Sequence, residues 1–337
     1  MVDCRLDFGI FSKFRGELMG IAILGVCLLH GFNWANISET SIGHFIRPFA
    51  KIAFTEGFLF LSGFGLYYSL SKNDDLRKFY IKRVNRVLLP YIIMGLPFFL
   101  LSLITGGISV SIFLLKITSL YFWFFGNDGM WYISMSVVLY LLFPFAYKFM
   151  FAQQKEIGVV TRTLVIIMTC VSACFALYDF VPHYYNMLQI GITKIPMFFI
   201  GMLVAWYSCL GLSMTWKHII GGGILLSITF LLKNHSDVFV PYYEMAYRLL
   251  MMPLFCFVIE YLKTKRLNVF LQWFGRYSLE IYVLQMLVIG VAQKVLTAMG
   301  CPLCLIPMLH TLLTFAIVIG FCVPIHNGID KLINKIE

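Results

Sequence analysis

Apolar stretches long enough to cross a membrane recur along the whole chain. Ten runs of roughly 16 to 21 residues have the length that an α-helix needs to span the hydrocarbon layer, and they occupy residues 16–34, 52–70, 87–105, 130–148, 161–179, 193–211, 218–233, 247–262, 278–297 and 304–324. The segments between them are short, and no Ser/Gly-rich linker or internal repeat interrupts the pattern. The sequence therefore predicts an all-α polytopic membrane protein with about ten transmembrane helices, organised as one domain over residues 1–337.

An eleventh apolar run, residues 108–126, differs from the other ten. It contains Lys116 and an aromatic cluster at 121–125, which is typical of helices at the water interface. With ten spans and an inner N-terminus, 19 of the 26 Lys and Arg residues lie on the cytoplasmic side, as the positive-inside rule requires. A further crossing at 108–126 would divide them about equally between the two sides. We therefore expect an outer interfacial or re-entrant helix near 108–126 and two cytoplasmic termini.

The composition makes lipid the solvent for most of the chain. Hydrophobic residues make up 60% of the 337 positions and charged residues 12%, which is about half the charged fraction of an ordinary soluble domain. The formal net charge of +10 would suggest a nucleic-acid partner for a soluble protein. In a membrane protein it follows from basic cytoplasmic loops, whatever the function. Membrane lipid is the expected partner, and nucleic acid is not.

His30 and Glu56 stand out among the ionisable residues inside predicted spans, where a charge is costly and therefore points to function. His30 and Glu56 each lie five residues outward of the middle of their span, so the two side chains are at the same depth. Consecutive antiparallel helices often pack together, and a Glu56 carboxylate in contact with His30 would fix the tautomer of the imidazole and raise its basicity. A pair that only holds two helices together is the alternative interpretation.

A basic segment from Lys72 to Arg86 precedes the third predicted span. Within it, Arg83 and Arg86 are three residues apart and share one helix face. Paired guanidinium groups at a membrane interface can each bind two oxygens of a phosphate group. Juxtamembrane Lys and Arg are also the usual signal for topology, so the segment taken alone favours that simpler interpretation.

Aromatic and polar residues at the outer ends of the predicted spans are candidate contacts for an acceptor substrate, although such residues also anchor helices at the interface; they are Asp128, Trp131, Tyr132 and Lys194. The sequence shows no metal-ligand spacing, P-loop or nucleophile elbow. We expect no metal and no permanently bound cofactor. The Ser-Gly pair within FLFLSGF is interpreted as a close-packing motif on a helix.

Four stretches of the sequence, taken in order, resemble the membrane acyltransferase 3 family, which includes O-acetyltransferases of surface glycans. They are GELMGIAILGVCLLH ending at His30, EGFLFLSGFGLYYS in the second span, FYIKRVNRVLLPYI with its Arg-x-x-Arg, and FGRYSLEIYVLQ near the C-terminus. The weaker matches MWYISMSVVLYLLFP and ITKIPMFFIGMLVA extend the resemblance over most of the chain.

This resemblance implies a ten-span inner-membrane enzyme that transfers an acyl group, usually acetyl, from cytoplasmic acyl-CoA to a glycan hydroxyl. By position, His30 is similar to the catalytic histidine, while Arg83 and Arg86 are similar to the residues that engage coenzyme A. Many members carry Lys or Arg where this chain has Met19, and Arg15, one turn earlier, is the candidate replacement. Gln285 stands where the family often has His, and Lys194 where Arg is common.

The expected activity is therefore that of an acyl-CoA-dependent O-acyltransferase of the cell (inner) membrane, with acyl-CoA as donor substrate and a carbohydrate or glycolipid as acceptor. His30 would act as the base and Glu56 as its orienting partner. A transporter of a glycan or lipid precursor is the alternative, but the paired halves usual in secondary transporters are missing from the sequence. A non-catalytic scaffold would require His30 and Glu56 to be a structural pair only.

Overall fold

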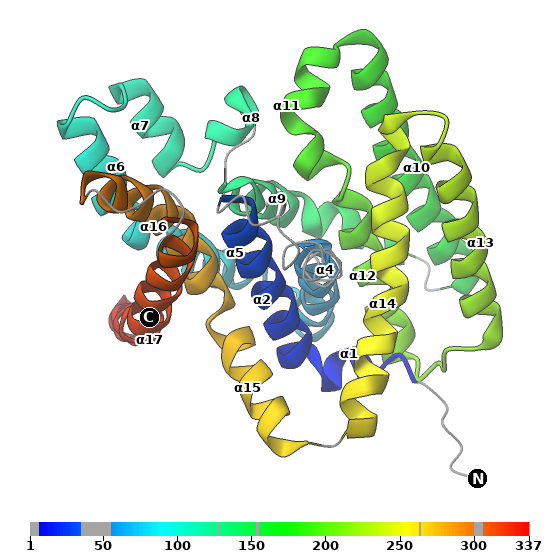
Figure 1. Ribbon diagram of the computed structural model, residues 1–337. Coiled ribbons are helices and arrows are strands. Elements are labelled where there is room, and N and C mark those ends of the chain that lie inside the picture. Colours follow the sequence, from blue (N-terminus) through cyan, green and yellow to red (C-terminus); the bar gives the residue numbers. More distant parts are fainter. Residues whose placement is uncertain are drawn as a thin grey trace.

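The computed structural model describes residues 7–34, 55–126, 129–152, 155–262, 264–299 and 306–336. These residues form helices with short connections and contain no strand, which confirms the all-α prediction (Figure 1). Six helical segments within the described residues are long and apolar enough to cross a membrane, namely Leu76–Ile104, Trp131–Phe151, Glu156–Phe180, Pro182–Cys209, Asp237–Leu262 and Leu312–Lys335. The chain is a helical membrane protein; the number of ten spans and the cytoplasmic placement of both termini stay predictions.

The predicted spans correspond to helices of similar extent. In chain order the helices are α1 (Ile10–Lys13), α2 (Arg15–Trp34), α4 (Thr55–Lys72), α5 (Leu76–Arg83), the π-helical turn η2 (Val84–Leu88), α6 (Leu89–Ile104), α7 (Val110–Ile117), α8 (Tyr121–Phe125), α9 (Trp131–Phe151), α10 (Glu156–Phe180), α11 (Pro182–Ile192), α12 (Ile195–Cys209), α13 (Trp216–Lys233), the short 3-10 helix η3 (Asp237–Phe239), α14 (Val240–Leu262), α15 (Lys265–Arg276), α16 (Ser278–Ala298) and α17 (Ile306–Ile336).

The run at 108–126 folds into two short helices, α7 and α8. The Ser109 side chain caps α7 by accepting a hydrogen bond from the backbone N–H of Ile112. Ser119, whose φ is 59°, breaks the run between the two helices. The 8 residues of α7 extend about 12 Å at 1.5 Å per residue, well short of the ~30 Å hydrocarbon layer. This segment does not cross as a single helix, as its Lys and aromatic content predicted.

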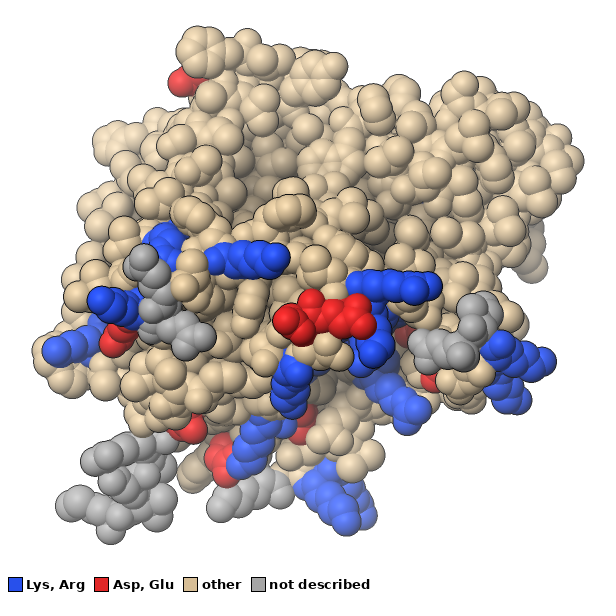
Figure 2. Space-filling model, turned by 180° about the vertical axis from the view of Figure 1, so that it is seen from behind, with Lys and Arg blue, Asp and Glu red and all other residues tan. Residues whose placement is uncertain are grey.

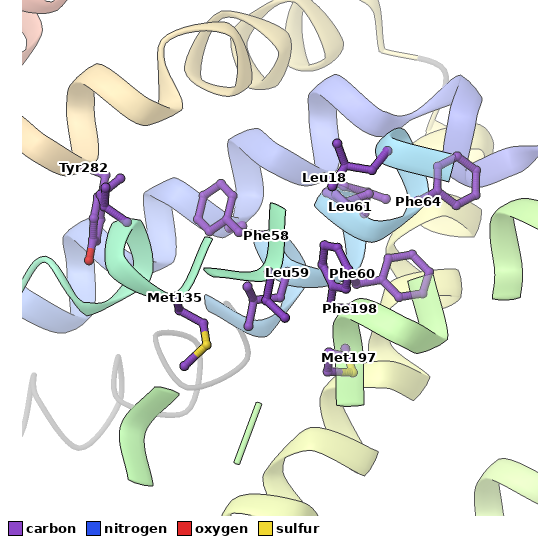
Figure 3. Packing of buried hydrophobic residues seen from close by; sticks show 14 of the residues in the cluster. Leu18, Phe58, Leu59, Phe60, Leu61, Phe64, Met135, Met197, Phe198 and Tyr282 are labelled. Atoms are coloured by element: carbon purple, nitrogen blue, oxygen red, sulfur yellow. The ribbon is translucent and has the colours of Figure 1, made fainter. Parts of the chain in front are cut away.

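Helices α4 and α12 pack closely at the centre of the molecule because both present glycines. A Cβ added at Gly63 would collide with the carbonyl oxygen of Phe198, and one at Gly201 would collide with that of Phe60. Large apolar side chains surround this contact, and Phe60 and Phe198 are fully buried there (Figure 3). The Ser-Gly motif in the second predicted span is therefore a close-packing motif, as interpreted from the sequence.

Helix α15, which no predicted span covers, packs on α2 in the same way. Gly20 of α2 meets the backbone of Leu271, and Gly275 of α15 meets the backbone of Gly16. One face of α15 is buried at Leu271 and Phe274, whereas Val269 is 57% exposed on the other face. The short amphipathic helix thus fixes the start of α2 and leads directly into α16 (Figure 1).

The outer surface of the helices is strongly apolar. Phe145 is 72% exposed, Ile157 and Phe180 are each 83% exposed, and α10 adds a row of exposed aliphatic residues. Exposed apolar area on this scale indicates contact with lipid. Figure 2 shows that Lys and Arg gather in a band across the lower half of the face it presents, while the upper part is almost free of charge.

Candidate functional site

A cavity of about 570 Å³ brings together residues from both ends of the chain. In the first half of the sequence its walls come from α2, α4, α5, η2, α6 and α9, and in the second half from α15, α16 and α17. Five cationic side chains line it: Arg15, Lys82, Arg83, Arg86 and Arg276. Two carboxylates, Glu280 and Asp330, and the imidazole of His326 line it as well. The cavity therefore carries a clear surplus of positive charge.

The two arginines of the Arg-x-x-Arg motif reach the cavity from a specialised stretch of helix. Helix α5 begins where the Asp75 side chain accepts a hydrogen bond from the backbone N–H of Lys78 (3.1 Å). Arg83 is the last residue of α5, and Arg86 lies in the π-helical turn η2. Single π-helical turns are frequent at functional sites. The sequence predicted that Arg83 and Arg86 share one helix face, and both side chains line the same cavity.

The guanidinium of Arg83 is only partly satisfied by the protein. Its Nη2 donates to Ser69 Oγ (3.3 Å), and its guanidinium carbon lies 5.5 Å from the centre of the Phe79 ring. Its Nε is buried and has no hydrogen-bond partner in the described part of the chain. Such donors are available to a ligand that carries oxygen acceptors.

Arg15, the predicted replacement for a basic residue at Met19, lies in the same cavity as Arg83. Its Nη2 donates to the carbonyl oxygen of Leu61 (3.5 Å), and its Nε is buried without a partner among the described residues. Met19 also lines the cavity, one turn further along α2. Across the ranges that the structure describes, no carboxylate forms an ion pair with Arg15, Arg83 or Arg86.

His30 does not line this cavity and has its hydrogen-bonding neighbour on α16. The side chain of Gln285 is its hydrogen-bonding neighbour. Gln285 also donates from Nε2 to the carbonyl oxygen of Cys27 and accepts from Cys27 Sγ, both at 3.2 Å. His30 Nδ1 is buried and has no partner within the described residues. Gln285 therefore stands at the candidate base, a position that the sequence marked only as a departure from the family pattern.

The cavity, as the described residues line it, does not include His30. On α2 the imidazole is 15 residues from Arg15, about 22 Å along the helix axis. Three aromatic rings that contact one another line the cavity: Phe58 and Tyr132 are tilted with 5.6 Å between ring centres, and Tyr132 and Tyr282 are edge-on with 5.7 Å between ring centres. Gln285 follows Tyr282 by one helical turn on α16.

The expected contact between Glu56 and His30 is wrong. Glu56 Oε1 instead pairs with Arg248 of α14 and lies 3.2 Å from Nζ of Lys194, the N-cap residue of α12. The carboxylate is 1% exposed, and a buried charge needs opposite charges as partners, which a neutral imidazole does not supply. Arg248 also pairs with Glu244 (3.1 Å), so Glu56 belongs to a chain of ion pairs that joins α4, α12 and α14.

The predicted acceptor residues that the structure describes do not form one cluster. Lys194 belongs to the ion-pair chain, and its ammonium lies 5.2 Å from the centre of the Trp131 ring. Tyr132 faces the other way, lines the cavity, and shares a hydrogen bond with Ser62 (3.3 Å). Asp128 lies outside the described residues.

A second group of cavity residues was missed by sequence reasoning. Among the described residues, Glu280 forms no ion pair with Arg276, one helical turn earlier. Instead, Glu280 Oε1 lies 2.7 Å from His326 Nδ1, and Asp330 Oδ2 lies 3.3 Å from His326 Nε2. The i,i+4 spacing of His326 and Asp330 was the only local signal in the sequence, because Glu280 is 46 residues away from His326.

Comparison with known protein families agrees with this arrangement. The model of an acyltransferase domain, acyltransferase 3, matches residues 18–327. Searches of curated proteins and of solved structures gave no match. The matched region includes His30, Arg83 and Arg86, as well as the whole of α16. Since it covers nearly the entire chain, the protein belongs to the membrane acyltransferase 3 family.

Proposed function

We propose that this membrane acyltransferase is an acyl-CoA-dependent O-acyltransferase of the cell (inner) membrane. It takes an acyl group, in our proposal acetyl, from cytoplasmic acyl-CoA and transfers it to a hydroxyl of a cell-surface or lipid-linked carbohydrate. The observation that carries the proposal is the cavity with its five cationic side chains. Acyl-CoA is a donor substrate here and leaves the site as CoA after each turnover.

The charges of the cavity suit a ligand with several phosphate groups. Arg15 and Arg83 each keep a buried Nε without a partner in the described ranges, and Arg86 is exposed toward the same space. Guanidinium groups bind phosphate oxygens in pairs, and such charge-assisted hydrogen bonds are roughly twice as strong as neutral ones. The phosphates of CoA are too polar to enter lipid, so they fit a basic cavity between the helices.

In the proposed reaction, His30 is the general base. The imidazole takes the proton of the acceptor hydroxyl while the hydroxyl oxygen attacks the carbonyl carbon of the thioester. The carbon–sulfur bond then breaks, the acyl group stays on the acceptor oxygen as an ester, and the CoA thiolate leaves. The imidazolium returns its proton to that thiolate, which restores His30 for the next cycle.

The thioester arm has to pass the aromatic rings of Phe58, Tyr132 and Tyr282 to approach His30. These rings line the cavity, and Gln285 follows Tyr282 by one turn of α16. We place the acyl arm there and the phosphates at the arginines, so that Tyr132 contacts the donor arm. Asp128, Trp131 and Lys194 remain proposed contacts on the acceptor side, with Lys194 acting from within the ion-pair chain of Glu56.

Binding of CoA to the purified protein tests the donor assignment. Replacing Arg83 and Arg86 together with Ala should weaken CoA binding by about tenfold or more, because each charge-assisted hydrogen bond contributes about 1.5 to 3 kcal/mol. Arg77→Ala is the matched control, since Arg77 is exposed on the same helix α5 and does not line the cavity. Equal CoA affinity in the double variant, or none in the wild type, would refute the assignment.

Transfer itself is measured by mass spectrometry of surface glycans from cells with and without the gene. Loss of one acyl mass in the deletion, and its return with the wild-type gene, is the expected result. Flux of a sugar lipid into liposomes that contain the protein but no acyl donor would instead favour a transporter.

A further inference from the structure

The cavity wall formed by α16 and α17 carries two carboxylates. The wall that carries Arg15, Arg83 and Arg86, which we call the arginine wall, is cationic. His326 lies between two carboxylates, with Nδ1 at 2.7 Å from Glu280 Oε1 and Nε2 at 3.3 Å from Asp330 Oδ2. The ring of Tyr277 stands edge-on to the imidazole, with 5.0 Å between ring centres. Three contacts thus fix one imidazole and two carboxylates in place, and all three side chains line the cavity.

Each carboxylate uses only one of its oxygens to hold His326. Glu280 Oε2 and Asp330 Oδ1 accept no hydrogen bond and form no ion pair within the part of the chain that the structure describes. An ionised carboxylate has about four acceptor positions and no donor. This wall therefore offers hydrogen-bond acceptors to the cavity and repels phosphate groups, while the arginine wall offers only donors.

A metal ion is a poor fit for this wall. The oxygens closest to His326 already contact its two ring nitrogens, so the imidazole has no nitrogen left for a metal. Among the described residues no group of His, Cys, Asp and Glu has the arrangement of a metal site. The five cations of the same cavity would also repel a metal ion.

A ligand that satisfies both walls carries anionic groups at one end and neutral N–H donors at the other. We propose that Glu280 and Asp330 recognise the exocyclic amine of the adenine base of the acyl donor. This inference rests on the proposed function, because it assigns the part of acyl-CoA that the arginines do not hold. The two walls together then fix the orientation of the donor, with phosphates toward Arg83 and Arg86 and the base toward α16 and α17.

The test compares CoA with its deaminated counterpart, in which hypoxanthine replaces adenine. The exocyclic amine becomes a carbonyl oxygen and ring N1 gains a proton, so at the exocyclic position an acceptor would face the carboxylates in place of a donor. We expect the wild-type protein to bind CoA about tenfold or more tightly than deaminated CoA, since a site built for a donor rejects an analogue that leaves its polar groups unpaired. Titration of the purified full-length protein in detergent or nanodiscs measures both affinities.

Asp330→Asn and Glu280→Gln should reduce or reverse this preference, because an amide can donate to the carbonyl of hypoxanthine. Asp74→Asn is the matched control, since Asp74 is exposed and does not line the cavity; it should keep the wild-type preference. Should Glu280→Gln fail to fold, Asp330→Asn and the ligand comparison on the wild type still decide the question.

The possible failures are distinguishable. Equal affinity of the wild type for CoA and deaminated CoA would overturn the adenine assignment and leave the donor assignment standing. An unchanged preference in folded Asp330→Asn and Glu280→Gln variants would overturn the roles of these two residues. No binding of CoA by the wild type would overturn the proposed function and this inference with it.

Discussion

Glu56 of α4 and Lys194, the N-cap residue of α12, form a buried ion pair, with 3.2 Å between Oε1 and Nζ. Arg248 of α14 contacts the same oxygen and continues to Glu244. Positive and negative side chains alternate along this series of ion pairs. Lys194 and Arg248, which lipid could not stabilise, are therefore held between helices by carboxylates. Helices α4 and α12 are thus connected both by the close packing at their glycines and by the Glu56–Lys194 ion pair.

Removal of the Glu56 charge should destabilise the protein. Glu56→Gln leaves Lys194 and Arg248 without the carboxylate, and breaking a buried pair in this way costs about 3 to 5 kcal/mol. We expect a lower melting temperature with CoA affinity close to that of the wild type. Adding Lys194→Met to Glu56→Gln should recover part of the lost stability, and a melting temperature unaffected by Glu56→Gln would contradict the structural role.

Replacement of the proposed base should abolish transfer and leave the fold intact. His30→Ala and His30→Gln remove the proton acceptor, and general base catalysis typically contributes about 10²- to 10⁴-fold to the rate. The rate of acyl transfer and the affinity for CoA are measured on the same preparations. Full acylation of the acceptor by either variant would exclude His30 as the base.

Gln285 should act as a positioning residue for His30. It holds the helix at Cys27 through two hydrogen bonds and has the imidazole as its neighbour. Gln285→Leu should slow transfer by about tenfold, because it leaves polar atoms of α2 unpaired and the imidazole free to rotate. The pH profile of transfer should also shift, whereas a purely structural role would lower stability without moving that profile.

A conservative change of the same residue provides the control for this prediction. Gln285→His restores a side chain that can donate and accept at the same place, and it should retain most of the activity. Cys27→Ser keeps a donor to the amide and should behave like the wild type. Equal losses in Gln285→Leu and Gln285→His would argue against positioning by a hydrogen bond.

The contact between α4 and α12 should not tolerate a side chain at Gly63. The new Cβ of Gly63→Ala would collide with the carbonyl oxygen of Phe198, and overpacking of this kind typically costs about 1 to 3 kcal/mol. Gly221→Ala in α13 is the control, because no atom lies within 4 Å of its Cβ position. Melting of the purified proteins should show a loss for Gly63→Ala and no loss, or a small gain, for Gly221→Ala.

Span lengths were enough to predict most of the long helices, and the proposed donor-binding residues Arg83 and Arg86 line one cavity. A run of apolar residues near the thickness of the hydrocarbon layer forms a helix almost irrespective of its neighbours, which is why α9 and α10 lie where the hydropathy places them. Helix α15 was missed because it is short and half polar. Likewise, the break at Ser119 depends on a local backbone conformation that hydropathy does not encode.

Pairings between distant helices could not be predicted in the same way. The equal depth of His30 and Glu56 suggested a contact. The Glu56 carboxylate pairs instead with Arg248, 192 residues away in the sequence, because a charged guanidinium attracts it more strongly than an imidazole does. The imidazole between Glu280 and Asp330 depends on the contact of α16 with α17, which nothing in a single sequence reveals. Matching by depth is therefore a weak guide where several titratable groups compete.

The π-helical turn η2 makes the length of the polypeptide between Arg83 and Pro90 as important as its composition. Deleting one residue from Val84–Leu88 would rotate everything that follows on α6 by about 100° about its axis. The guanidinium of Arg86 would then no longer point into the cavity while the apolar side of α6 faces lipid. An insertion or deletion in this turn would therefore separate the membrane anchor from the ligand pocket, even if every side chain of the turn were kept.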